Sequence, residues 1–232
     1  MKKAILYIMA IAAMLVFVSG HAFAQEKKTF GNTGFSVVEA GWGMYITISQ
    51  GSSYSVEVEA DKRDMEVLKV KQSGSSLEFY IDKSNYRKHG DVIITIKMPV
   101  LTGISLSGGS HGKISMNIAS KSFDGELSGG AELKGSLQCG NISLDCSGGS
   151  VVTLNGKGKN LSVEASGGSV FNLKDFSVYD VNADLSGGSS IAVTANGTIS
   201  SDQSGGSHIT YYGKAKMGSN DFSGGSGISK GN

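Results

Sequence analysis

The sequence predicts an all-β protein, in which a parallel β-helix-like solenoid of about seven short coils follows a less regular β segment stacked on it. The triplet Ser-Gly-Gly returns every 18 to 21 residues, at Ser107, Ser128, Ser147, Ser166, Ser186, Ser204 and Ser223. A unit repeated at a fixed period buries its apolar face by stacking on copies of itself. Apolar and polar residues also alternate around each triplet, as in β-strands with one buried face. We therefore divide the chain into residues 1–24, 25–100 and 101–232.

Residues 1–24 have the pattern of a secretory signal peptide. Lys2 and Lys3 precede an apolar run over residues 4–18, and Ala22 and Ala24 flank a predicted cleavage before Gln25. We therefore expect export to the periplasm, the cell surface or the medium. No later apolar run approaches the roughly 20 residues of a membrane span, so we expect no transmembrane span in the mature chain.

The charge balance argues against nucleic acid as a partner. The whole chain has 21 basic and 20 acidic residues, and removing residues 1–24 leaves 19 and 20, because that segment holds two lysines and no acid. A nucleic-acid-binding domain normally carries a marked basic excess.

The two cysteines, Cys139 and Cys146, are expected to stay unbridged. If residues 141–146 form one extended strand, its five steps span roughly 16 Å. The Cα atoms of a disulfide lie within about 7 Å. Cys146 is therefore read as a small buried residue, and Cys139 as lying near a corner of the coil.

Residues 25–100 predict six strands by their alternation and by the Gly-rich and polar breaks between them. The strands are expected over residues 35–38, 44–48, 54–59, 67–71, 77–81 and 92–97, with a helical turn over 61–66. Pro99 cannot donate to a strand ladder and fits the end of the last strand. The boundary with the solenoid is placed there.

In the solenoid, alignment on the Ser of each triplet sets the register. Mostly apolar residues lie one, three and five positions before that Ser, and again five and seven positions after it. This predicts one inward-facing strand on each side of the triplet. Each coil is then strand, Ser-Gly-Gly-Ser corner, strand and variable corner, stacked at about 4.8 Å.

The glycines of the triplets are expected to be structural, because glycine readily adopts the positive φ of a tight corner. A phosphate-binding loop or a nucleophile elbow would need a following helix, which this repeat does not predict. The Ser after each glycine pair, replaced once by Ala131, can hydrogen-bond to backbone or to the Ser one coil away. The corner glycines are Gly108, Gly109, Gly129, Gly130, Gly148, Gly149, Gly167, Gly168, Gly187, Gly188, Gly205, Gly206, Gly224 and Gly225.

A column of acids stands two residues before the triplets and is the candidate binding feature. Its members are Glu126, Asp145, Glu164, Asp184, Asp202 and Asp221, and Ser105 alone interrupts the series. They alternate with inward positions, so they point outward, and stacking brings neighbours to roughly 5 Å, where like charges repel by about 1 kcal/mol. The column either binds a hard cation such as calcium or a cationic partner, or it is a solvated face that discourages edge-to-edge association.

Catalysis has little support in the sequence. His111 and His208 both follow a corner, but five coils separate them by roughly 24 Å, too far to share a metal. Asp124, with Glu126 and Asp145, could imitate the acids of a polysaccharide-degrading β-helix enzyme. These acids belong to the repeat, whereas an active site is usually a local departure from it. We therefore expect no enzyme and no cofactor, with calcium as the open possibility.

The chain resembles the putative auto-transporter adhesin, head GIN domain family, a domain of unknown function in Bacteroidetes-type envelopes. The resemblance rests on residues 33–41, 44–51 and 54–61 together with the Ser-Gly-Gly-Ser repeats, and it covers most of residues 30–226. It implies a β-helix-like fold, export to the cell envelope and adhesion, and it supplies no catalytic residue. The chain departs from the family where corners often continue with Asp, since His111, Glu132, Val151, Val170, Ser190, His208 and Gly227 stand there.

The favoured function is an exported, non-catalytic, adhesin-like module that presents a repetitive polar solenoid face to glycans or to proteins of a cell surface. One alternative is a pectinase-like β-helix enzyme. Another is a lipid-binding envelope protein, which would need an apolar cavity that the inward columns look too full to leave. Self-association through coil ends is also expected, because the last coil, with Phe222 and Ile228, has no obvious polar cap.

Overall fold

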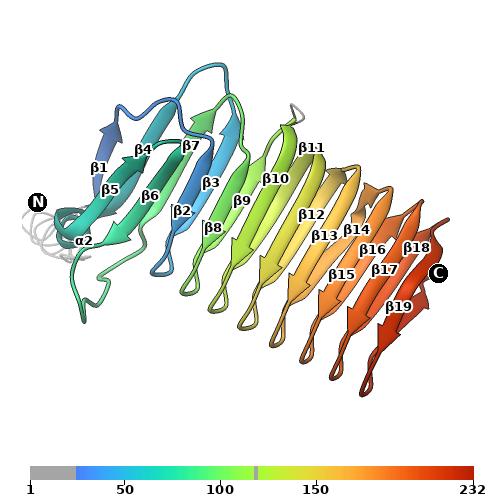
Figure 1. Cartoon of the computed structure of the whole chain (residues 1–232). Helices are drawn as coiled ribbons and strands as arrows, with labels where there is room; N and C mark the ends of the chain where they lie inside the picture. The colour runs from blue at the N-terminus through green and yellow to red at the C-terminus, as the bar shows by residue number, and fades with distance from the viewer. Residues whose placement is uncertain (1–24, 118–119) are drawn as a thin grey trace, which may run out of the picture.

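The computed structural model describes residues 25–117 and 120–232, and the expected signal peptide lies outside them. The described chain is an all-β solenoid of about seven turns that continues from a curled mixed sheet at its N-terminal end (Figure 1). Both parts of the predicted fold are therefore confirmed. No helix among the described residues is long and apolar enough to cross a membrane.

Two sheets, A and B, form the opposite walls of the solenoid. In order of hydrogen bonding, sheet A contains β1 (Gln25–Phe30), β4 (Ser55–Asp61), β7 (Ile93–Met98), β3 (Tyr45–Gln50), β9 (His111–Ser115), β11 (Glu132–Cys146), β12 (Val151–Lys157), β14 (Val170–Val178), β16 (Ser190–Ala195), β18 (His208–Gly213) and β20 (Gly227–Lys230). Sheet B contains β5 (Leu68–Ser73), β6 (Ser76–Ile81), β2 (Val37–Ala40), β8 (Gly103–Leu106), β10 (Ser120–Leu127), the second half of β11, β13 (Asn160–Ala165), β15 (Asp180–Leu185), β17 (Thr198–Gln203) and β19 (Lys216–Phe222). The pairs β1–β4, β4–β7 and β5–β6 are antiparallel, and the other pairs are parallel.

The N-terminal segment contains the six expected strands, each within two residues of its predicted bounds, and the expected helical turn is α2 (Lys62–Val67). Its strands β2 and β3 already form a coil, because they pair in parallel with β8 and β9 of the first Ser-Gly-Gly coil. Strand β1 was not expected. Its sequence does not alternate, because it is an edge strand whose residues are exposed except for the half-buried Phe30.

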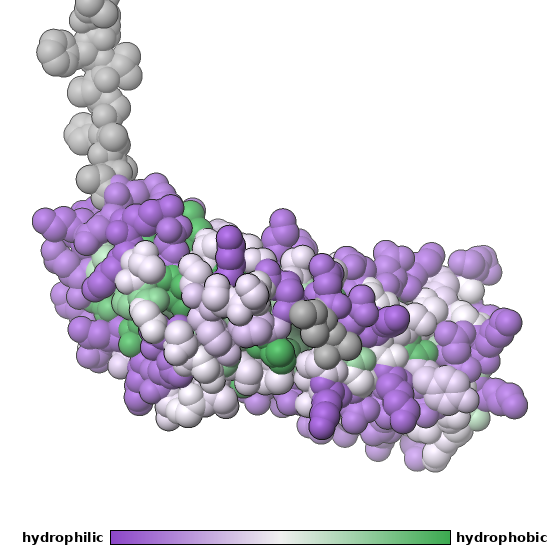
Figure 2. Space-filling view, turned by 90° about the horizontal axis from the view of Figure 1, so that it is seen from above, coloured by the Kyte–Doolittle hydropathy of each residue, from purple (hydrophilic) through white to green (hydrophobic). Residues whose placement is uncertain are grey.

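The core fills the space between the sheets. The inward positions predicted from the triplets are buried, from Ile104 and Leu106 of β8 to Ile199 of β17. At the C-terminal end Phe222 is 50 % exposed, because no further coil covers it in the structure. The outer surface seen from above is mostly hydrophilic, with hydrophobic surface only in small separate areas (Figure 2).

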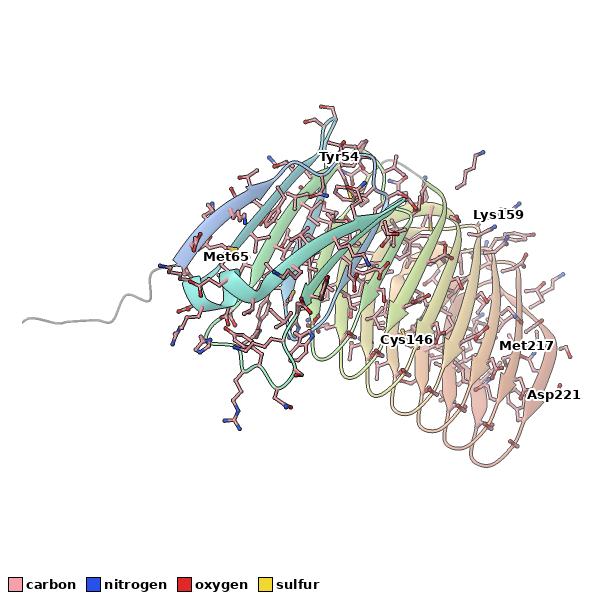
Figure 3. All side chains as sticks on the ribbon, turned by 60° about the vertical axis from the view of Figure 1, so that its left-hand side comes forward. Tyr54, Met65, Cys146, Lys159, Met217 and Asp221 are labelled. Atoms are coloured by element: carbon pink, nitrogen blue, oxygen red, sulfur yellow. The ribbon has the colours of Figure 1, made fainter. Side chains whose placement is uncertain are left out.

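The two cysteines are free, as expected. Cys146 lies inside the solenoid (Figure 3), and Cys139 lies where β11 passes from sheet A to sheet B. Burial raises the pKa of Cys139 to about 11. Burial, with a smaller contribution from the charge of Asp145, raises the pKa of Cys146 to about 12.

The corner glycines form two kinds of turn. The first glycine of every triplet has a φ between 58° and 72°, but the second has a positive φ only at Gly109, Gly130 and Gly149. A positive φ at both central residues is typical of a type I′ turn, and a positive φ at the first alone of a type II′ turn. Our expectation of positive φ is therefore wrong for the second glycine of the last four corners, Gly168, Gly188, Gly206 and Gly225.

The difference between the turns comes from the peptide between the two glycines. In an early corner the backbone nitrogen of Gly109 donates to the carbonyl of Gly129, one coil ahead, at 3.1 Å. In a late corner the nitrogen of Gly188 donates to the carbonyl of Gly167, one coil behind, at 2.6 Å. The nitrogens of Gly206 and Gly225 likewise donate one coil behind, to Gly187 and Gly205, so these late corners point this N–H in the direction opposite to that of Gly109.

The serine after each glycine pair closes the corner from inside, as one of the two expected alternatives. Its hydroxyl donates to the carbonyl of the Ser that opens the triplet, over 2.7 to 3.0 Å. These serines are Ser110, Ser150, Ser169, Ser189, Ser207 and Ser226. A hydroxyl bonded to its own turn stabilises the corner locally, and Ala131 keeps only the backbone bond from its nitrogen to the carbonyl of Ser128.

Candidate functional site: the outer face of sheet B

The predicted acid column exists as a straight row along the outer face of sheet B, which we call the acid rail. Its six expected members are exposed, and each is the Cα partner of the next in parallel register: Glu126, Asp145, Glu164, Asp184, Asp202 and Asp221. The register continues beyond Ser105 to Glu39 in β2 and Glu78 in β6. These two were missed because residues 25–100 contain no triplet on which to align them.

The acid rail is a strip of unpaired negative charge. Within residues 25–117 and 120–232, no ion pair involves any of its carboxylates. In the same residues, no group of three or more His, Cys, Asp or Glu side chains is arranged to hold a metal ion. Single-file carboxylates resemble a charged surface more than the cage of six to eight oxygens that calcium takes.

Beside the acid rail, toward the variable corners, sheet B carries a shallow groove of about 520 Å³. Short polar side chains from consecutive strands line it, and the amide of Asn160 donates to the amide oxygen of Asn141 at 2.9 Å. The polar lining residues are Ser122, Asp124, Asn141, Ser143, Asn160, Ser162, Asp180, Asn182, Thr198 and Ser200. The groove therefore repeats similar donors and acceptors at the spacing of the coils.

Smaller hollows connect this groove to the N-terminal end of the same face. A hollow of about 230 Å³ shares Asp124 and Ser143 with the groove, and it shares Glu126 and Asp145 with a third hollow of about 190 Å³. The third shares Ser105 with a fourth of about 210 Å³ beside Trp42. We call this row of hollows, from Trp42 to Ser200, the sheet B track. It crosses six strand-to-strand steps, or roughly 29 Å.

The edge of sheet B opposite the acid rail is basic and aromatic. Lys159 lies at this edge (Figure 3), and its carbonyl accepts from the backbone nitrogen of Tyr179 at 2.8 Å. The side chain of Tyr179 is 60 % exposed. Lys121, near the start of β10, and Lys216, at the start of β19, are also exposed on this side. A ligand in the groove would thus meet lysines on one side and carboxylates on the other.

A comparison with protein families shows to which family the chain belongs. The family described as "Putative auto-transporter adhesin, head GIN domain" matches residues 34–215. The chain belongs to this head GIN family. The match includes the whole sheet B track and every member of the acid rail except Asp221.

Solved structures from Bacteroides and Parabacteroides have a similar fold. A crystal structure titled a putative adhesin from Bacteroides fragilis is 21% identical, with a TM-score of 0.83, covering 89% of this chain and 96% of its own. Another, from Parabacteroides merdae and also titled a putative adhesin, is 12% identical, with a TM-score of 0.71 and coverage of 90% and 96%. A third, titled a putative lipid binding protein from Parabacteroides distasonis, is 15% identical, with a TM-score of 0.70 and coverage of 90% and 97%. These likenesses concern the fold. None of the curated proteins matches the chain.

Two histidines of this head GIN domain, His111 and His208, lie far apart on sheet A. His111 is five strand pairings from His208, as expected. The Nδ1 atom of His111 lies 3.2 Å from a carboxylate oxygen of Glu132, and its ring stacks on Tyr45 at 4.9 Å. Hydrogen bonds from Lys134 and then from His111 hold the pKa of Glu132 below its usual value.

A buried carboxylate, Asp64, holds a loop of the N-terminal segment. It accepts from the backbone nitrogens of His89 and Gly90 at 3.0 Å and from the hydroxyl of Tyr86 at 2.9 Å. Burial and then this hydrogen bond raise the pKa of Tyr86 to about 12. A fully satisfied buried carboxylate of this kind fixes backbone, and its role is structural.

Proposed function

We propose that this head GIN domain is an exported, non-catalytic, adhesin-like module that binds an extended glycan along the sheet B track. The observation that carries the proposal is the row of adjoining hollows on one face, most of whose lining residues are polar. An extended polymer repeats the same groups along its length, and a solenoid repeats its side chains at about 4.8 Å per coil. Repeated polar contacts on a rigid surface therefore suit a polymer better than a compact ligand.

The chemistry of the groove fits hydroxyl groups. Serine, threonine and asparagine side chains both donate and accept hydrogen bonds, and Asp124 and Asp180 add acceptors. The strands that carry them are paired on both sides, so little ordering accompanies binding. The family name, adhesin, supports a role in attachment, and it agrees with a location at the cell surface.

The non-catalytic part of the proposal rests on the regularity of the acids. Asp124, Glu126 and Asp145 line one hollow, but Glu126 and Asp145 continue a row that runs the length of sheet B. The lipid-binding alternative receives no support from the core, because the inward columns between the sheets are filled by buried side chains.

A polysaccharide array probed with the purified protein tests the proposal. A matched pair of variants tests whether the glycan binds to sheet B and not to sheet A. Ser143→Tyr places a large side chain in the groove, and Asn172→Tyr places the same side chain on the exposed face of sheet A. We expect binding to a subset of extended polymers, at least a ten-fold loss in Ser143→Tyr, and wild-type binding in Asn172→Tyr.

Two results would overturn the proposal. Absence of binding to any polymer would remove the glycan function. Release of new reducing ends from a bound polymer would replace it with the pectinase-like alternative. Export is tested separately by fractionating the native host and sequencing the mature N-terminus, which we expect to begin at Gln25.

A further inference from the structure

We propose that the hollow beside Trp42, at the N-terminal end of the sheet B track, is a subsite that stacks a single sugar ring. The inference rests on the proposed glycan function, and it assigns Trp42 as the residue that holds one sugar of the glycan. The hollow has a volume of about 210 Å³, below the 300 Å³ or more of sites for drug-sized ligands. Its lining includes Glu39, Trp42, Glu78, Tyr80 and Ser107.

Trp42 is a local departure from the repeat. Strand pairing places it in register with Gly108, the first glycine of the next corner. Every Ser-Gly-Gly corner has glycine at this position, with positive φ, and Trp42 adopts a φ of 61° there despite its bulk. A left-handed conformation costs a residue with a Cβ atom on the order of 1–2 kcal/mol.

Packing does not explain this tryptophan. Its side chain is 43 % exposed, whereas the inward residues of the neighbouring coil are buried. A large aromatic residue that is held at an unfavourable backbone conformation and is 43 % exposed is only partly used for packing. Trp42 borders the hollow, so the exposed part of its side chain is available to a ligand there.

The polar groups of the hollow complement the edge of a sugar ring. Glu39 and Glu78 are Cα partners, and a carboxylate oxygen of Glu39 accepts from the hydroxyl of Ser76. Neither acid forms an ion pair within the part of the chain that the structure describes. Both can therefore accept charge-assisted hydrogen bonds from ligand hydroxyls.

The charges around the hollow favour a neutral ligand over an ion. Lys69 and Lys71 of β5 are the Cα partners of Tyr80 and Glu78, so positive and negative side chains border the hollow. A sugar ring has a C–H face, which suits the negative face of an indole, and an edge of hydroxyl donors and acceptors. Tyr80 and the serines can donate to such an edge, and the two glutamates can accept from it.

The test uses the fluorescence of Trp42, which is the only tryptophan of the chain and so reports on this hollow alone. The protein is titrated with a panel of neutral monosaccharides and with the polymer that binds best on the array. We expect a saturable change in tryptophan emission. We also expect Trp42→Gly, which restores the residue of the other corners, to lower polymer affinity at least ten-fold. Trp42→Phe should retain most of the affinity, and Glu78→Gln should weaken it without unfolding the protein.

The outcomes separate the subsite from the proposed function. If a polymer binds and Ser143→Tyr blocks it, while Trp42→Gly binds normally and Trp42 emission stays constant, the subsite is overturned and the glycan function stands. If no polymer binds and no monosaccharide changes the emission, both are overturned. If monosaccharides give a saturable change in emission but no polymer binds, the sugar subsite at Trp42 stands. The proposal that an extended glycan binds along the sheet B track is then overturned.

Discussion

Trp42 and Gly108 occupy equivalent positions in two stacked corners, and both adopt the left-handed conformation, with φ of 61° and 58°. The corners touch closely, since a Cβ atom on Gly108 would lie 3.3 Å from the backbone nitrogen of Trp42. The Ser-Gly-Gly corners have no side chain at this position. The corner at Trp42 carries one, and Trp42 is 43 % exposed there.

Trp42→Gly is expected to leave the free energy of unfolding unchanged or to raise it by up to about 1.6 kcal/mol. Relief of left-handed strain contributes about 1–2 kcal/mol, and the greater freedom of glycine in the unfolded chain offsets about 0.4–1 kcal/mol of it. Urea unfolding of the two proteins measures the difference. A loss above 1 kcal/mol would show that the indole stabilises the fold and would weaken its assignment to a ligand.

Gly187→Ala and Gly188→Ala are expected to differ sharply although the residues are adjacent. At Gly187 φ is 69° and a Cβ atom would lie 2.6 Å from the carbonyl oxygen of Gly167, whereas at Gly188 φ is not positive and the nearest atom would be 3.7 Å away. We expect Gly187→Ala to lose at least about 2 kcal/mol, and Gly188→Ala to change stability by less than about 1 kcal/mol. Thermal unfolding of both variants measures this, and equal losses would contradict a turn with positive φ at its first glycine alone in this corner.

The sequence was sufficient for the solenoid because its information is local and repeated. Each triplet fixes the register of the strands beside it, so the burial of Leu144 and the exposure of Asp145 follow from counting. The sheet B track was not predictable in this way. That Glu39 and Glu78 continue the acid rail depends on β2 and β6 pairing beside β8, a contact between segments without a shared repeat.

The orientation of the corner peptides was beyond sequence reasoning for a different reason. The seven corners all contain the same Ser-Gly-Gly triplet, yet Gly149 has a φ of 87° and Gly168, in the next corner, has no positive φ. Glycine permits both turns, so an identical triplet does not determine which of the two is formed.

The thiols of Cys139 and Cys146 are expected to resist a thiol reagent at pH 8 in the native protein and to react together after denaturation. The buried thiols have pKa values of about 11 and about 12, so little thiolate is present at this pH. Because the folded pKa values exceed that of an unfolded cysteine, about 8.5, their contribution to stability is complete below that pH and is lost as the pH rises toward 11. A colorimetric thiol count with and without denaturant tests this, and a count below two in denaturant would indicate a disulfide.

Asp145→Asn is expected to stabilise the protein at low salt. Asp145 lies in register between Glu126 and Glu164, and carboxylates about 4.8 Å apart in water repel by about 1 kcal/mol. Salt screens this repulsion, so the gain in melting temperature should be clear near 10 mM salt and small near 1 M, where the Debye length falls to about 3 Å. Asp91→Asn, at an exposed acid of a loop outside the acid rail, is the matched control and should show a smaller gain.

Calcium at constant ionic strength should leave the difference in melting temperature between Asp145→Asn and the wild type unchanged, because single-file carboxylates do not enclose an ion. If calcium instead raised the melting temperature of the wild type but not of Asp145→Asn, the acid rail would be a cation site and its repulsion would be the driving force for binding.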